Sequence, residues 1–86
     1  MDPEASVMVI DDCCYMLKII KNVFQEMNIA CDYAVNGFRG LELLDSRLNM
    51  MQQDKEVKPI KIIFLDYDMP ALDGCQTAGC IQELYK

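Results

Sequence analysis

The chain has 86 residues, enough for one domain over residues 1–86, and 14 Asp and Glu against 8 Lys and Arg give it a formal net charge of −6. We expect no binding to nucleic acid, whose phosphates are neutralised by basic side chains. Histidine and tryptophan are absent, which excludes imidazole-dependent nucleophiles and histidine-ligated zinc. The acidic N-terminus is unlike a signal peptide and no apolar run is long enough to span a membrane, so we expect a cytoplasmic protein without membrane contact. The five cysteines form no CxxC pair and are interpreted as reduced, core-filling side chains.

Short apolar runs alternate with amphipathic stretches along the chain. The runs predict strands over residues 6–10, 29–35 and 60–65. Apolar residues that recur every three or four positions predict helices over residues 13–27, 38–51 and 75–84. Asp32 interrupts the second strand, which favours a less buried position near a sheet edge, and either Asp11 or Asp12 can cap the first helix. The order β-α-β-α-β-α predicts a parallel sheet with right-handed crossovers.

Carboxylates follow two of the predicted strands, Asp11-Asp12 after the first and Asp66 after the third. In an open parallel sheet, ligands bind beyond the carboxyl ends of the strands. If these two strands are neighbours, three carboxylates converge, repel one another and raise their pKa values. A hard divalent cation removes this repulsion, and Mg²⁺ prefers carboxylates together with waters and phosphate oxygens. Each Asp alone is an ordinary cap or turn residue, but together they predict a Mg²⁺ site that also receives a phosphoryl group.

Three segments of the sequence carry a family resemblance. They are Val7-Met8-Val9-Ile10-Asp11-Asp12, then Asn36-Gly37 with Leu41, then Ile63-Phe64-Leu65-Asp66-Tyr67-Asp68-Met69-Pro70 with Asp73-Gly74. Together they resemble the receiver domain of two-component response regulators, over essentially the whole chain from Ser6 to Lys86. The resemblance implies an α/β, flavodoxin-like receiver fold, with a parallel sheet of order 2-1-3 from the strands present.

The resemblance also implies a role for each acidic residue. Asp66 is then the phosphoacceptor, which takes a phosphoryl group from a phosphohistidine of a sensor histidine kinase or a histidine phosphotransfer protein. Asp12 and Asp66 bind Mg²⁺ directly, Asp11 acts through a bound water, and the backbone carbonyl of Asp68 supplies another ligand. Met69-Pro70 and Asp73-Gly74 shape the loop that positions Asp66. The chain is then a phosphorelay signalling module and not an enzyme.

The family pattern is incomplete in this sequence. The receiver fold continues for two more βα units, whose strands end in a Ser or Thr and in a Lys that contact the phosphoryl group. Neither Thr77 nor Lys86 corresponds to these positions. We therefore expect a C-terminally truncated receiver domain, a fragment of a larger signalling protein such as a hybrid kinase. Its third strand is then an open apolar edge, a site for pairing with another chain.

Two other interpretations remain open. A degenerate pseudo-receiver would keep the fold and act only as a protein-interaction module, which the missing Ser or Thr and Lys favour. The segment Phe64-Leu65-Asp66-Tyr67-Asp68 also resembles the first motif of haloacid-dehalogenase-like phosphatases. In those enzymes the motif opens the catalytic domain, whereas here only a short segment follows it.

Overall fold

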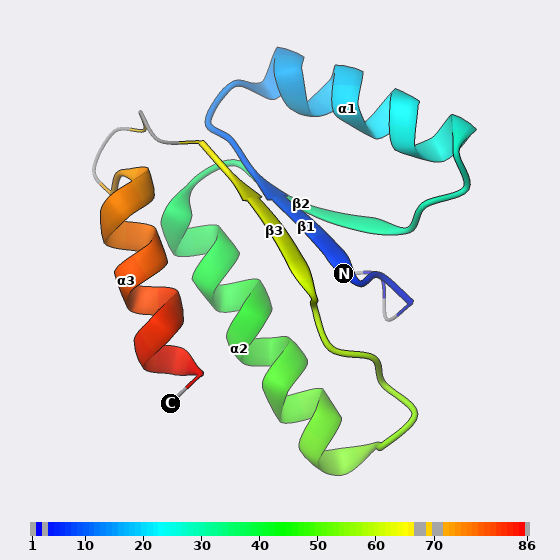
Figure 1. The fold of residues 1–86 in the computed structure, drawn as a ribbon, viewed down its shortest axis with the longest axis vertical. Helices are drawn as coiled ribbons and strands as arrows, with labels where there is room; N and C mark the ends of the chain where they lie inside the picture. The colour runs from blue at the N-terminus through cyan, green and yellow to red at the C-terminus, as the bar shows by residue number, and fades with distance from the viewer. Residues whose placement is uncertain (1, 3, 67–68, 70–71, 86) are drawn as a thin grey trace.

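The computed structural model describes residues 2, 4–66, 69 and 72–85, which form one parallel sheet and three helices. The elements in chain order are β1 (Val7–Ile10), α1 (Cys14–Glu26), β2 (Cys31–Ala34), α2 (Gly37–Gln53), β3 (Ile62–Leu65) and α3 (Gly74–Leu84). Helix α1 lies on one side of the sheet, and α2 and α3 lie on the other (Figure 1). The strand order β2-β1-β3 confirms the predicted 2-1-3 sheet and the flavodoxin-like receiver architecture.

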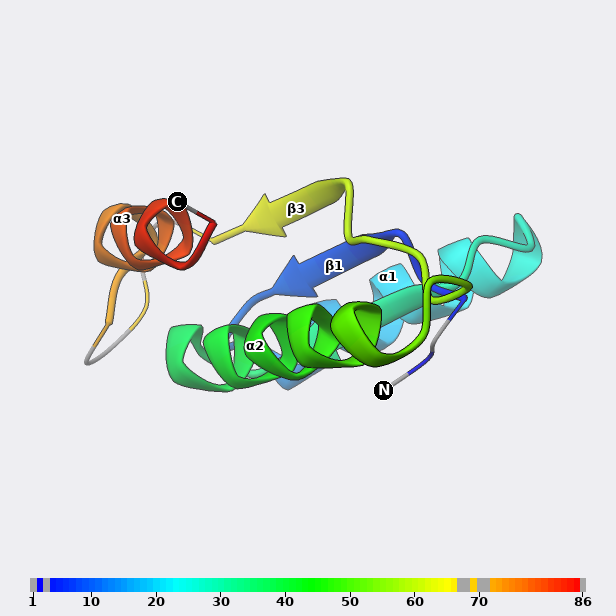
Figure 2. The same ribbon diagram turned by 90° about the horizontal axis from the view of Figure 1, so that it is seen from below.

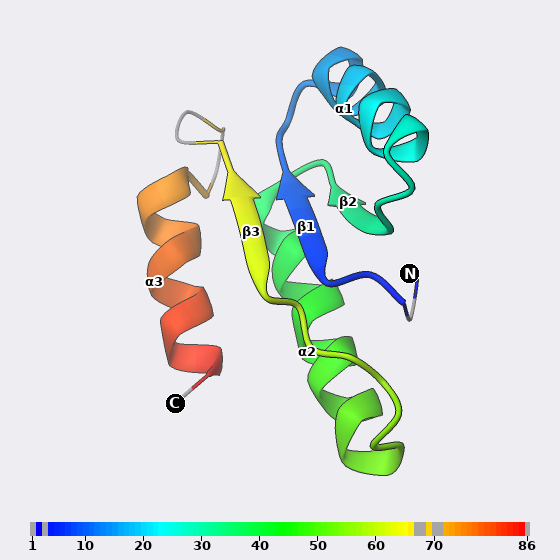
Figure 3. The same cartoon turned by 45° about the vertical axis from the view of Figure 1, so that its right-hand side comes forward.

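Strand β1 is the centre of the sheet, and its residues are apolar on both faces because neighbours cover it on both sides. Ile10 pairs in parallel with Ala34 of β2 and with Leu65 of β3. Figure 3 shows the three arrows running in the same direction, so that all three strands end at the same edge of the sheet. Met8 and Ile10 are fully buried in the core cluster, which also includes Leu44 of α2.

Helix α1 begins differently from the prediction. Its N-cap is Cys13, which makes no side-chain cap hydrogen bond, so the expectation that Asp11 or Asp12 caps the helix is wrong. Instead, the Cys13 N–H donates to Asp11 Oδ1 at 2.9 Å. The Asp11 side chain therefore bonds the amide that precedes the helix, which is a turn geometry typical of Asp. Asp12 is left exposed.

The other two helices begin at capping residues that the sequence pattern contains. Asn36 Oδ1 accepts a hydrogen bond from Arg39 N–H at 2.7 Å, and α2 starts at the next residue, Gly37. Asp73 caps α3 through a complete capping box, in which Gln76 N–H donates to Asp73 Oδ1 at 2.8 Å. Helix α2 extends to Gln53, two residues beyond the predicted end.

The apolar face predicted for α1 is only partly buried. Leu17 is buried, Ile20 and Phe24 are half-buried, and Met27 is exposed. Seen from below in Figure 2, α1 lies nearer to β1 and β2 than to β3, and the side chains of Ile62 and Phe64 on β3 are exposed. The periodicity therefore correctly predicted the helix, but among the described residues nothing covers most of its apolar face.

Asp32 is more buried than its interruption of an apolar strand suggested. It lies on β2, which is an edge strand as predicted, but the residue is only 5% exposed. The reason is a buried ion pair, in which Arg47 Nη2 of α2 lies 3.1 Å from Asp32 Oδ2. A charge that is paired and hydrogen-bonded can be buried at an otherwise apolar position.

The cysteines differ from the interpretation as core-filling residues. All five are free thiols, as expected, but Cys13, Cys14, Cys75 and Cys80 are exposed and only Cys31 is partly buried. The methionines contribute more to the core, since Met8 and Met69 are both buried there. Within the described ranges, no helix combines the length and apolar character that a membrane crossing requires.

Candidate metal centre at the carboxyl ends of β1 and β3

Two strand ends bring the acidic residues together. Ile10 pairs with Leu65 in the parallel register of β1 and β3, so the next residues, Asp11 and Asp66, follow at the same edge. The hydrogen-bond ladder continues past the strands, because Asp66 N–H donates to Ile10 O at 2.9 Å and Asp11 N–H donates to Ala34 O at 3.1 Å. The backbone of both aspartates is therefore fixed by the sheet, and their positions follow from its register.

The three predicted carboxylates form one cluster. One carboxylate oxygen from each of Asp11, Asp12 and Asp66 lies within 4.8 Å of the other two. Asp11 and Asp66 are half-buried, and Asp12 is exposed. Among the ion pairs of the described residues, none joins a Lys or Arg to any of these three carboxylates. The cluster therefore concentrates negative charge that no described basic side chain neutralises.

The pKa of Asp12 is raised in this cluster. The loss of hydration around its carboxyl raises the pKa of Asp12 above its ordinary value of 3.8, and the nearby charge of Asp66 raises this pKa further. Repulsion between carboxylates at this spacing favours the protonated form of one of them. A cation bound between the carboxylates would reverse this effect.

The donor set fits a hard divalent cation. Carboxylate oxygens are the ligands that Mg²⁺ uses in proteins, usually one or two together with waters and phosphate oxygens. Asp12 is open to solvent, which leaves room for such waters. Asp68, whose backbone carbonyl is a predicted ligand, lies outside the described residues.

The loop after Asp66 is anchored at two described points. Met69 is buried and belongs to the hydrophobic core cluster. Asp73 caps α3 through its side chain, and the next residue, Gly74, is buried. The role of these residues in shaping the loop stays a prediction, since Tyr67 and Pro70 lie outside the described part of the chain.

Sequence reasoning missed two residues that support the site. The backbone N–H of Cys13 holds one carboxylate oxygen of Asp11, and no side-chain pattern could have indicated this. Gly40 of α2 packs directly on Ile10, the residue before Asp11, and a methyl group at this glycine would overlap the Ile10 side chain. The only signal in the sequence was a glycine inside a helical pattern, which often marks close packing.

Comparisons with known proteins bear on the fold of the chain. No family model matches the chain. It is similar to the receiver domain of the histidine kinase CKI1 from Arabidopsis thaliana, solved with Mg²⁺ and BeF₃⁻ (TM-score 0.80, 23% identity, 91% of this chain and 54% of that one). It matches the same domain solved with Mg²⁺ alone equally well (TM-score 0.80, 23% identity, 93% of this chain and 57% of that one). The described residues therefore have the receiver-domain fold.

A curated protein is similar at the level of sequence. The chain is 29% identical over 76 residues to Hybrid signal transduction histidine kinase F of Dictyostelium discoideum. The match covers 88% of this chain and 6% of that protein. The chain thus spans a small part of the curated relative and about half the length of the solved receiver domains.

Proposed function

We propose that the chain is a phosphoacceptor receiver domain of a two-component phosphorelay, a cytoplasmic signalling module that accepts a phosphoryl group on Asp66 with Mg²⁺. The observation that carries this proposal is the convergence of three carboxylate oxygens within 4.8 Å at the carboxyl ends of β1 and β3. It is supported by the receiver-domain fold, in which a similar domain was solved with Mg²⁺ and BeF₃⁻.

Each carboxylate of the cluster has a distinct part in this proposal. Asp12 and Asp66 bind Mg²⁺ directly, and the backbone carbonyl of Asp68 is a further ligand. Asp11 acts through a bound water, which is compatible with its geometry because one of its oxygens already accepts the Cys13 N–H. When bound, Mg²⁺ would supply positive charge that offsets the charge of the transferring phosphoryl group.

The reaction makes Asp66 the nucleophile. A carboxylate oxygen of Asp66 attacks the phosphorus of a phosphohistidine, a P–O bond forms, and the P–N bond to the imidazole breaks. The imidazole nitrogen keeps the electron pair of that bond and takes up a proton from water. The product is an acyl phosphate on Asp66, held at the end of β3 by its backbone hydrogen bond to Ile10 O.

The phosphoryl donor is a sensor histidine kinase or a histidine phosphotransfer protein. This assignment is supported by the names of the similar proteins, a histidine kinase and a hybrid histidine kinase. The chain itself then acts as a receiving module without turnover of its own, and it operates with the rest of a larger hybrid kinase.

Thermal unfolding with Mg²⁺ and beryllofluoride tests the proposal. A ligand present at a hundred times its dissociation constant stabilises the native state by about 2.7 kcal/mol, which shifts the unfolding temperature of a small domain by several degrees. We expect this shift for the wild-type chain and not for Asp66→Asn, and a weaker Mg²⁺ response for Asp12→Ala. Asp45→Asn is the matched control, because it removes an exposed carboxylate on α2 outside the cluster.

A direct assay measures phosphorylation. A small phosphoramidate should add one phosphoryl group to the intact chain in the presence of Mg²⁺, observed as a mass increase that is lost in Asp66→Asn. Labelling that survives in Asp66→Asn would contradict the assignment of the acceptor. A cooperative unfolding transition with no response to Mg²⁺ or beryllofluoride would instead favour the pseudo-receiver that acts only through protein contacts.

A further inference from the structure

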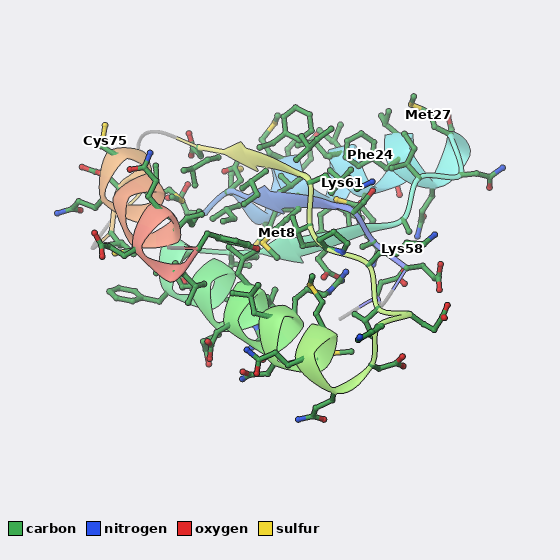
Figure 4. The ribbon with its side chains drawn as sticks, turned by 60° about the horizontal axis from the view of Figure 1, so that its bottom comes forward. Met8, Phe24, Met27, Lys58, Lys61 and Cys75 are labelled. Carbon is green, nitrogen blue, oxygen red and sulfur yellow. The ribbon has the colours of Figure 1, made fainter. Side chains whose placement is uncertain are left out.

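Helices α2 and α3 lie next to each other on the same side of the sheet and leave a groove between them. Figure 4 shows both helices on this side, with Met8 between the sheet and α2. The helices pack closely where they begin, because Gly37 of α2 lies against the side chain of Thr77 of α3. Farther along, a groove of about 490 Å³ separates them. We call it the α2–α3 groove; its lining includes Phe38, Leu41 and Asp45 of α2 and Cys80 and Leu84 of α3.

Part of the lining is apolar. Leu41 and Leu84 are half-buried, and Phe38 at the start of α2 is 56% exposed. Leu41 and Asp45 follow Phe38 by three and seven positions, so these three side chains share one face of α2. A groove with such a face can receive the apolar side chains of a helix, which recur at positions i, i+3 or i+4, and i+7. The α2–α3 groove therefore has the features of a helix-binding site.

The α2–α3 groove is also acidic. Glu42, Asp45 and Glu83 all line it, and none of its described lining residues is a Lys or an Arg. Arg39 lies 3.9 Å from Glu42, but both side chains are exposed, and an exposed ion pair of this kind is weak. The chain as a whole carries a formal net charge of −6. Because complementary charges select the partner at an interface, this groove favours a cationic partner.

The α2–α3 groove does not depend on what adjoins β3. Both of its walls belong to the described chain, and α2 packs on β1 and β2. In the strand order β2-β1-β3, further strands of a receiver fold would join the sheet beside β3, on the side away from β1. They would therefore extend the molecule away from α2, and not into the groove.

The charge of the groove disfavours a second copy of the chain as its occupant. In a twofold dimer, the same surface patch of both copies meets. Two α2–α3 grooves would then bring the three carboxylates of one copy against the same three of the other, and like charges placed in this way oppose association. A basic segment of a different polypeptide avoids this repulsion, and its apolar side chains can cover Phe38.

We propose that the α2–α3 groove binds a basic amphipathic helix of another polypeptide. Apolar side chains of that helix enter the groove beside Phe38, Leu41 and Leu84, and its Lys or Arg side chains pair with the three carboxylates of the groove. The groove shares no residue with the acidic cluster at Asp66, so this binding requires neither Mg²⁺ nor phosphorylation. It would hold the chain and a partner together independently of phosphoryl transfer.

Fluorescence anisotropy with a synthetic peptide tests the charge preference. The probe is a labelled helical peptide of about 15 residues, with leucines at positions i, i+4 and i+7 between lysines. It should bind the intact chain, whereas a peptide with glutamate in place of each lysine should not. Asp45→Lys should raise the dissociation constant of the basic peptide by about tenfold or more. Glu26→Lys is the matched control, because it makes the same charge change at an exposed residue of α1, on the other side of the sheet (Figure 1).

Alkylation of the cysteines shows where the peptide binds and requires no variant. Cys75 and Cys80 are both exposed thiols on α3, but of these two only Cys80 lines the groove. Cys75 points away from α2 in Figure 4. At a peptide concentration of about ten times the dissociation constant, alkylation of Cys80 should slow by about tenfold, because only the unbound chain reacts there. The alkylation rate of Cys75, measured by mass spectrometry in the same samples, should not change.

Four results would overturn the proposal. The first is a basic peptide that does not bind at about 1 mM, or that binds no more tightly than the acidic one. The second is an equal effect of Asp45→Lys and Glu26→Lys on the dissociation constant. The third is a Cys80 thiol that reacts as fast in the peptide complex as in the free chain. The fourth is protection of Cys80 in the chain alone as its concentration rises, which would make a second copy the occupant of the groove.

Discussion

Replacing Arg47 by methionine should destabilise the fold more than any exposed charge change. Arg47 is fully buried. Its Nη1 donates to Ala5 O and Lys58 O, both at 2.7 Å, and its Nη2 donates to Asp2 O at 2.6 Å. The same Nη2 pairs with Asp32 at 3.1 Å. In Arg47→Met, the buried Asp32 loses its ion-pair partner and keeps the hydrogen bond that Asp2 N–H donates to its Oδ1 at 2.8 Å.

The expected loss is large compared with the stability of a small domain. Removing one partner of a buried ion pair costs about 3–5 kcal/mol, because the other charge stays buried without compensation. A chain of 86 residues has a free energy of unfolding of about 4–13 kcal/mol. Arg47→Met should therefore remove about a quarter or more of the stability, or unfold the chain. The double variant Arg47→Met/Asp32→Leu removes both charges and should recover much of the loss.

Denaturant unfolding measures these differences directly. Arg39→Met is the control, since Arg39 pairs with Glu42 at 3.9 Å with both side chains exposed, and such a pair contributes about 0–0.5 kcal/mol. If Arg47→Met costs less than about 1 kcal/mol, or if the double variant is no more stable than the single one, the buried pair is not a major source of the stability of the fold.

Two further predictions concern close packing and titration. Gly37→Ala should lower the free energy of unfolding, measured with denaturant, by about 1–3 kcal/mol, because a methyl group at this position overlaps the buried Thr77 Oγ1. Gly79→Ala has open space around the added methyl group and should stabilise α3 by about 1 kcal/mol. A Gly79→Ala variant that is less stable than Gly37→Ala would contradict the α2–α3 packing. Burial, together with the nearby Cys31 thiol, raises the pKa of Tyr33 from 10.0 to about 12, so the folded state holds this proton more tightly and stability should fall as the pH rises from about 10 to about 12. Tyr33→Phe should reduce the dependence of stability on pH in this range, and Tyr15→Phe, at an exposed position, should not. Equal pH profiles of stability for the two variants would refute the raised pKa of Tyr33.

The sequence was sufficient for the strands and for the acidic residues at their ends because both depend on local patterns. Short apolar runs identify buried strands, and Asp11 and Asp66 directly follow two of them. Once these strands are adjacent and parallel, their ends share one edge of the sheet, and the cluster of oxygens within 4.8 Å follows from the register. No long-range information was needed beyond the adjacency of β1 and β3, which the family resemblance supplied.

The sequence was not sufficient where the partner of a residue is distant along the chain. Asp32 was interpreted as a sign of weak burial, since nothing near it in sequence indicated that Arg47, 15 residues away, would pair with it. The apolar face of α1 is a second case in which the sequence was not sufficient. Its period correctly predicted a helix, but burial depends on what covers the face, and Met27 lies exposed because no described element reaches it.

The buried Arg47 connects the fold with the site, although it lies at the end of the sheet opposite to the acidic cluster. Its hydrogen bonds reach Ala5, which precedes β1, Lys58, which precedes β3, and Asp32 within β2. A slip of one residue between parallel strands turns each side chain to the opposite face of the sheet, which would separate Asp11 from Asp66. By holding the entry points of the strands, Arg47 also fixes where they end. A folded Arg47→Met/Asp32→Leu variant that binds Mg²⁺ as tightly as the wild-type chain would show, instead, that the pairing of β1 with β3 sets the register without this clamp.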